Sequence, residues 1–158
     1  MAKIKRSVII QFDDEFSKAL TTLGNRTDEI LGKAMTAGAE AALPTVRECL
    51  QSVVGRGNKY PDRSTGEMVN SLGTSPVKVD SKGVVNVKIG FNEPRKRQYT
   101  SKKTGKRTEV TNGLIANILE NGKHGQPPRP WLKRAKTQAT KVFRAKAQEI
   151  IDKEVEKL

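Results

Sequence analysis

The fold of this chain is decided by residues 27–54, TDEILGKAMTAGAEAALPTVRECLQSVV. The apolar side chains of this stretch recur at helical spacing along one stripe, and Thr27 is a residue type that caps a first turn. The stretch therefore predicts a long helix, in which Pro44 either produces a kink or divides two helices in series. Its many alanines leave room for a second helix or a neighbouring subunit to approach closely.

A second long helix is predicted at the end of the chain, from Trp131 to Leu158. A stiff, extended connection precedes it, because residues 125–130 contain three prolines. The expected apolar stripe of the helix is formed by Leu132, Ala135, Ala139, Val142, Phe143, Ala147, Ile150 and Val155. Basic residues are expected on the opposite side, namely Lys133, Lys136, Lys141 and Arg144.

The region between the two long helices changes its apolar period. Residues 76–80 and 84–89 each alternate apolar and polar side chains, and residues 81–83 (Ser-Lys-Gly) form a turn sequence between them. These residues predict an antiparallel hairpin. Residues 65–72 are ambiguous, with helical spacing between Met68 and Leu72.

Two shorter helices are also predicted. Residues 114–120 favour a helix that is capped by Thr111 or Asn112 and ended by Gly122. Near the start of the chain, residues 8–12 favour a strand, and a helix follows it as far as residue 24.

These elements predict one α+β domain over residues 1–158. A small, mainly antiparallel sheet is packed by the long alanine-rich helix and the long C-terminal helix. The length of 158 residues suits a single domain. Aromatic residues make up only 4% of the chain, so the core is expected to be thin. Extended arms or a partner subunit should therefore complete the packing.

Several classes of protein are excluded by composition. No stretch approaches the roughly 18 consecutive apolar residues of a membrane span, and the apolar segment after the basic start is too short for a signal peptide. One cysteine, Cys49, and one histidine, His124, cannot build a disulfide framework or a zinc cluster. We therefore expect a chain that folds in a reducing cytoplasm without membrane contact, metal or cofactor, with Cys49 as a small buried side chain.

Catalysis is not expected. The chain shows no nucleophile elbow, no phosphate-binding glycine loop after a strand, and no paired carboxylates at metal-binding spacing. His124 falls in a loop, where it has no sequence-adjacent catalytic partner. The sequence therefore predicts that the protein is not an enzyme.

Residues 92–110 contain the densest charge of a chain whose net charge is +13. The basic residues of this segment are Arg95, Lys96, Arg97, Lys102, Lys103, Lys106 and Arg107. With Glu93 and Glu109 as its acidic residues, the segment has a net charge of +5. The Thr-Gly turn sequence at 104–105 and this charge predict either a protruding two-stranded arm or a disordered loop. Its expected partner is a nucleic acid, through counterion release, or an acidic protein. Tyr99 is its only aromatic residue, so it offers no stacking platform for single strands.

Two stretches resemble a family of small phage structural proteins. Residues 115–122, IANILENG, together with Lys123, resemble the family pattern Tyr-Ala-x-x-x-Glu-x-Gly-Thr. Residues 129–135, RPWLKRA, resemble part of a second family pattern, Arg-Pro-Phe-Leu-x-x-Ala. The family is that of the tail-completion, or head–tail joining, proteins of long-tailed phages. The matching residues are Ala116, Glu120, Gly122, Arg129, Pro130, Leu132 and Ala135, with Thr65 and Gly66 resembling an upstream Thr-Gly pair. The chain departs from the pattern at Ile115, Lys123 and Trp131, where the family has Tyr, Thr and Phe.

The resemblance implies a virion structural protein at the head–tail junction, made in the cytoplasm of the bacterial host. Such a protein forms a ring, expected to be a hexamer, that terminates the tail tube or joins the tail to the neck. Its implied partners are copies of itself, the tail tube protein and the neck or connector proteins. The basic segment would contact a neighbouring subunit or the phage DNA passing through the channel. The alternative interpretation is a free DNA- or RNA-binding protein.

The residues of the resemblance also have a structural interpretation of their own. Gly122 is suited to end a helix, and Glu120 and Arg129 are suited to form a charge-assisted fork that fixes where the last helix begins. Trp131 would then anchor that helix. We favour this interpretation over a direct contact of the same residues with a partner.

Overall fold

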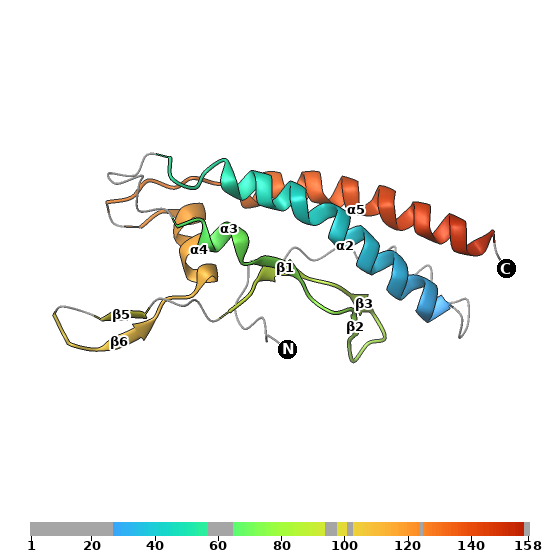
Figure 1. Ribbon diagram of the computed structural model, residues 1–158, viewed down its shortest axis with the longest axis horizontal. Helices are drawn as coiled ribbons and strands as arrows, with labels where there is room; N and C mark the ends of the chain where they lie inside the picture. The colour runs from blue at the N-terminus through green and yellow to red at the C-terminus, as the bar shows by residue number, and fades with distance from the viewer. Residues whose placement is uncertain (1–26, 57–64, 94–97, 101–102, 124, 157–158) are drawn as a thin grey trace.

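The computed structural model describes residues 27–56, 65–93, 98–100, 103–123 and 125–156. The strand and helix predicted before residue 25, and His124, lie outside these ranges. The described elements, labelled as in Figure 1, are α2 (Thr27–Gln51), α3 (Glu67–Asn70), β1 (Leu72–Thr74), β2 (Lys78–Val79), β3 (Val85–Asn86), β4 (Ile89–Phe91), β5 (Gln98–Thr100), β6 (Arg107–Glu109), α4 (Asn112–Asn121) and α5 (Leu132–Val155).

Helix α2 passes through Pro44 without a break, so the alternative with two helices in series is wrong. Pro44 removes one backbone hydrogen bond, but it lies on the exposed side of the helix, where water can reach the freed carbonyl. Ala42 and Val46, on either side of it, are both buried. Packing of this inner face therefore holds the helix together across the proline, and Figure 1 shows the axis of α2 changing direction near its middle.

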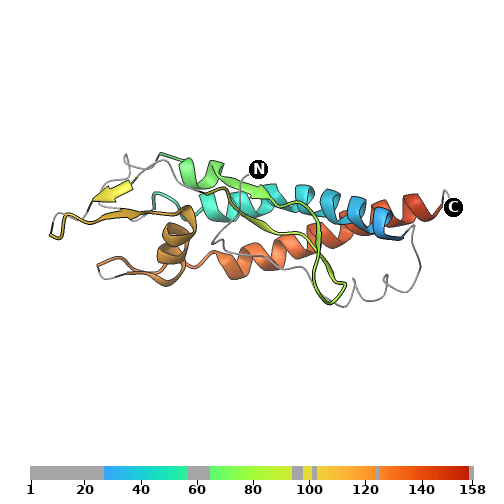
Figure 2. The same ribbon diagram turned by 90° about the horizontal axis from the view of Figure 1, so that it is seen from below.

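Helix α5 packs antiparallel along α2, as Figures 1 and 2 show. The two helices lie in close contact at Gly38, where a methyl group would come within 2.8 Å of the ring of Phe143. Because Gly38 has no side chain, the aromatic ring of α5 can lie directly on the backbone of α2. The prediction that the small residues of α2 admit a second helix is thus confirmed, and the second helix belongs to the same chain.

The buried side chains of α5 follow a spacing of four residues. They are Ala135, Ala139, Phe143, Ala147 and Ile151. A row spaced by four drifts around the helix relative to 3.6 residues per turn. The sequence pattern also assigned Val142 and Val155 to the apolar stripe. This prediction is wrong for both residues, because they are 37% and 55% exposed.

The predicted hairpin is confirmed and is longer than expected. Strands β2 and β3 pair antiparallel around the turn, and β1 and β4 continue the pairing, with Leu72 opposite Phe91. The Asp80 carboxylate accepts hydrogen bonds from the amides of Lys82 and Val84 at 2.8 and 3.0 Å, which fixes the turn. The ambiguous residues 65–72 divide between the short helix α3 and Leu72, which begins β1 and pairs with β4.

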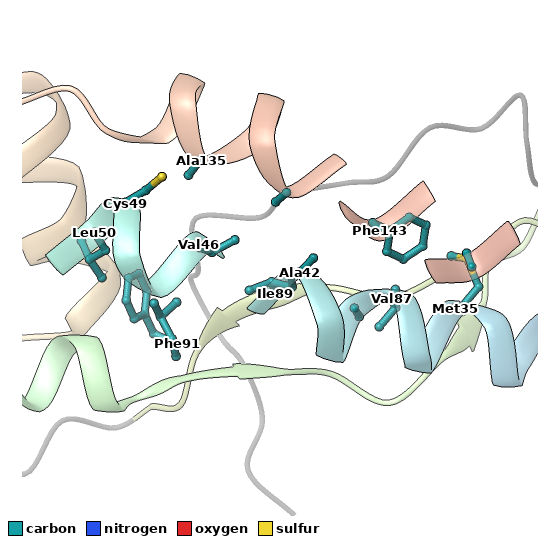
Figure 3. Close-up of a cluster of buried hydrophobic side chains, with 14 of the residues drawn as sticks. Met35, Ala42, Val46, Cys49, Leu50, Val87, Ile89, Phe91, Ala135 and Phe143 are labelled. Atoms are coloured by element: carbon teal, nitrogen blue, oxygen red, sulfur yellow. The ribbon is translucent and has the colours of Figure 1, made fainter. Parts of the chain in front are cut away.

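The hairpin packs on the face of α2 that α5 leaves free. Figure 3 shows Val87, Ile89 and Phe91 of the hairpin beside side chains of α2 such as Val46 and Leu50. The core is therefore a layer between two helices and a narrow antiparallel ribbon. The α+β class predicted from the sequence is confirmed.

Candidate functional site

The basic segment forms an arm. Strands β5 and β6 pair antiparallel, with Gln98 opposite Glu109. Of the two predicted alternatives, a two-stranded arm or a disordered loop, this pairing confirms the first. Figure 1 shows the pair extending away from α2 and α5. Lys103 and Lys106 are exposed between the two strands, and Arg107 begins β6. The other basic residues proposed for partner contact, Arg95, Lys96, Arg97 and Lys102, lie outside the described residues.

The root of this arm is fixed to the body of the protein by a buried carboxylate. Glu93 is 9% exposed, and its Oε1 accepts a hydrogen bond from the Gly113 amide at 2.9 Å. Thr111 caps the same end of α4 by accepting from the Leu114 amide at 3.1 Å, as predicted. Both groups satisfy amides that a helix start leaves without intrahelical partners. Sequence reasoning counted Glu93 only as charge balance, because nothing in its neighbourhood indicates that it is buried.

The carboxylate of Glu120 caps helix α5. Its Oε2 accepts hydrogen bonds from the backbone amides of Trp131 and Leu132 at 2.8 and 2.9 Å. A negative charge at this position also complements the positive end of the helix dipole. Glu120 therefore fixes where the last helix begins, as predicted, although it does so through the backbone.

The guanidinium of Arg129 closes the end of α2. It donates to the carbonyl oxygens of Val53, at 3.1 Å, and of Arg56. These carbonyls follow the last turn of α2, where a cation complements the negative end of the helix dipole. The fork expected between Glu120 and Arg129 is thus replaced by two separate caps, each on a different long helix.

Gly122 lets the chain reverse between these two caps. Its φ is +74°, a conformation that side chains other than glycine rarely adopt. A methyl group there would also lie 2.8 Å from the carbonyl oxygen of Gln126 and 2.9 Å from the nitrogen of Pro128. Both the backbone angle and the lack of space therefore require glycine, which explains its place two residues after Glu120.

The remaining residues of the resemblance divide into buried and exposed positions. Trp131 is 1% exposed, and Ala116 and Ala135 are fully buried. Leu132 packs partly buried against the core, and Gly66 caps α3 with a φ of +69°. The two exposed residues are Thr65 and Pro130.

Glu120, Gly122, Arg129 and Trp131 thus lie where the ends of α2, α4 and α5 meet, and we call these four residues the junction. The Arg129 amide ties the junction to α4 by donating to the Leu119 carbonyl at 2.7 Å. The Arg134 guanidinium adds a bond to the Ser52 hydroxyl next to α2. The polar groups of the junction are therefore used to hold helix ends in place.

The described residues show little that could carry chemistry. Among them, no three His, Cys, Asp or Glu side chains gather as a metal site. Cys49 is 4% exposed and its thiol donates to the amide oxygen of Gln138 at 3.2 Å, so its predicted burial is confirmed. None of the described helices is long and apolar enough to cross a membrane.

Comparison with known proteins gives no match to a family, to a curated sequence or to a solved structure.

Proposed function

We propose that this chain is a virion structural protein that forms a ring, expected to be a hexamer, at the head–tail junction of a long-tailed phage. In that position it terminates the tail tube or joins the tail to the neck, binding copies of itself, the tail tube protein and the neck or connector proteins. The observation that carries the proposal is the junction. Its residues, which resemble the phage family, fix the ends of both long helices to each other.

The junction supports an assembly role because it makes a rigid building block. Glu120 and Arg129 bind backbone groups, so the relative position of α2 and α5 does not depend on mobile side-chain pairs alone. A ring subunit needs such a fixed shape, because each error in its interfaces is repeated at every copy. No catalytic activity is required for this function.

The arm supports the same proposal as the part that reaches a neighbour. Its two strands pair with each other, and its root is held by Glu93 and Thr111. Like charges at Lys103 and Lys106 favour an extended position in the absence of an anionic partner. We propose that the arm contacts an adjacent subunit or ring, or the DNA in the channel.

Deletion of residues 95–107 tests this function. The subunit should keep its cooperative unfolding, because the core lies in α2, α5 and the hairpin, whereas heads and tails made with it should fail to join. Replacing only Lys103 and Lys106 by alanine gives a matched variant that keeps the arm but removes two charges. Normal particles from the deletion variant would remove the arm from the proposal. A density map of the mature particle without this chain between portal and tube would overturn the proposal as a whole.

The second candidate is a free nucleic-acid-binding protein, which the net charge of +13 favours. This function predicts tight binding to duplex or single strands that weakens steeply with salt. About six phosphate contacts would give a slope near −5 in a plot of log affinity against log salt. A binding titration at several salt concentrations, combined with a mass measurement in solution, distinguishes this candidate from a ring subunit.

A further inference from the structure

The charges of the α2–α5 pair are segregated along its length. The first part of α5, residues 132–145, contains five basic residues and no acidic one. At the opposite end of the pair, residues 27–40 and 146–156 together contain seven acidic and three basic residues, a net charge of −4. Because the two helices are antiparallel, these acidic segments lie at the same end (Figure 1).

The basic part of α5 exposes three lysines at its surface. Lys133, Lys136 and Lys141 are exposed, and none of them forms an ion pair with another described residue. Thr137 and Thr140 lie between them and donate their hydroxyls to carbonyls of their own helix. Two of these lysines stand in the first turns of α5, where cations oppose the helix dipole. The folded subunit alone therefore gains nothing from this arrangement.

The acidic end contains a groove between α2 and α5. It is lined by Gly32, Lys33, Thr36, Ala37 and Glu40 of α2 and by Ile150 and Glu154 of α5. Lys33 pairs with Glu29 and Glu154, so three carboxylates, counting Glu40, surround one ammonium group. A methyl group on Gly32 would meet no atom within 4 Å, so packing within the subunit does not require this glycine. Glycine inside a helix lowers stability relative to alanine. Its presence at the floor of an open groove keeps the approach to α2 free.

We infer that the basic face of α5 (Lys133, Lys136 and Lys141) docks on the acidic groove of a second copy of this chain. The two surfaces are complementary in charge, and Lys133, Lys136 and Lys141 form no ion pair with a described acidic residue of their own subunit. Contact between unlike ends is a heterologous interface, which repeats from copy to copy and closes a ring. This inference rests on the proposed ring and specifies one of its interfaces. A nucleic acid would account for the basic face but not for the acidic groove.

Charge reversal at each surface, separately and together, tests this interface in the full-length chain. The variants are Lys133→Glu with Lys141→Glu, Glu29→Lys with Glu40→Lys, and the combination of all four. Glu29 is chosen because its side chain is 73% exposed and lies next to the groove in α2. Lys78→Glu with Lys82→Glu, at two exposed lysines of the hairpin, is the control with the same change in charge as the Lys133/Lys141 variant. Sedimentation at low salt measures self-association, and thermal unfolding shows that each variant is folded.

We expect the wild-type chain to self-associate at low salt and to dissociate as salt is raised, because the contact is between exposed charges. Each reversed pair should weaken association by about tenfold or more, and the four-site variant should recover it because attraction is restored with opposite signs. The hairpin control should associate like the wild type. A monomeric wild-type chain, association that the reversals leave unchanged, or a four-site variant that does not recover would each overturn the inference.

Two further results distinguish a subunit interface from a nucleic-acid surface, and the interface from the function of the ring. Loss of duplex-DNA binding in the Lys133/Lys141 variant, without recovery of self-association in the four-site variant, would identify a nucleic-acid surface and overturn the inference. Absence of the chain from the mature particle would overturn the proposed function, whereas the recovery of association in solution would still stand. Failure of the interface and failure of the function are therefore distinguishable.

Discussion

The two ends of the α2–α5 pair use charged side chains in different ways. At the junction, Glu120 and Arg129 bind backbone amides and carbonyls at the ends of the two helices. At the other end, Lys33 pairs with Glu29, which is 73% exposed, and with Glu154, which is 22% exposed. Charged side chains thus bind backbone groups at one end of the pair and other charged side chains at the other.

This difference implies that, among the charged side chains of the pair, those at the junction contribute most to its stability. Removing one partner of a buried hydrogen bond leaves the other unsatisfied and costs about 1–3 kcal/mol. Exposed ion pairs contribute little, because water and salt screen them and long side chains lose freedom when they pair. The acidic end is therefore free to be shaped by contacts outside the subunit.

The largest effect is expected for Trp131→Ala, at the junction. Trp131 is 1% exposed, and truncating a buried aromatic side chain to alanine costs about 3–5 kcal/mol. Urea unfolding followed by circular dichroism measures this change. Trp131→Phe is the matched control. It keeps most of the ring and removes an indole N–H that is buried without a partner among the described residues. A Phe variant as unstable as the Ala variant would contradict the expected role of ring packing.

The next effect is expected for Glu120→Ala, which should lower the free energy of unfolding by about 2 kcal/mol. The amides of Trp131 and Leu132 would lose their shared acceptor at the start of α5. Glu120→Gln keeps an oxygen at the same position and should lose about half as much or less, because only the charge is removed. Equal losses in the two variants, measured by urea unfolding, would show that the charge rather than the capping bond matters.

Two glycines of α2 provide a comparison of opposite sign. Gly38→Ala should destabilise the fold by about 1–3 kcal/mol, because the new methyl group meets the buried ring and the backbone oxygen of Phe143. Gly32→Ala should stabilise it by up to about 1 kcal/mol, because its methyl group meets nothing and alanine favours a helix. Thermal unfolding of both variants checks the two signs. Destabilisation by Gly32→Ala would show that the groove is not open in the folded subunit.

The smallest effect is expected at Glu149, at the acidic end. Hydrogen bonds from Lys146 and then Lys153 lower the pKa of its carboxyl from 4.5 to about 2. Because the pKa is lower in the folded state, the carboxylate stabilises the fold at pH values above its unfolded-state pKa near 4.5. This contribution is lost as the pH falls toward the folded-state pKa of about 2. The side chain is 42% exposed, so water screens its ion pairs and the urea midpoint of Glu149→Gln at neutral pH should hardly change. Carboxyl NMR should show a titration far below the ordinary range, and one near 4.5 would disprove the pairing.

Much of the local structure could be predicted from the sequence because it depends on neighbouring residues. Thr111 could be identified as a candidate cap of α4, because a capping side chain bonds to an amide only a few residues further along the chain. The alternation of residues 76–89 around a short turn likewise located the hairpin. Pro44 was harder, because whether a proline breaks a helix depends on the packing of the turns beside it. The buried Ala42 and Val46 supply that packing.

The candidate site could be predicted only in part. Glu120, Gly122, Arg129 and Trp131 were identified together, yet the bonding partners of two of them were wrong. A carboxylate and a guanidinium close together in the sequence suggest a salt bridge between Glu120 and Arg129. In the fold, Glu120 instead binds amides at the start of α5, and Arg129 binds carbonyls that follow α2. The burial of Glu93 was not predicted, because it depends on which parts of the chain pack around this residue in the fold.

By itself, the sequence determined where the two long helices and α4 begin, where the hairpin turns and that the chain is strongly basic, since these depend on periodicity, capping and composition. The tertiary structure alone decided that Phe143 lies on Gly38, that Glu120 caps α5 while Arg129 closes α2, and that opposite charges collect at opposite ends of the pair. These contacts join residues far apart in the chain. Their identity depends on how whole segments pack, which no local pattern specifies.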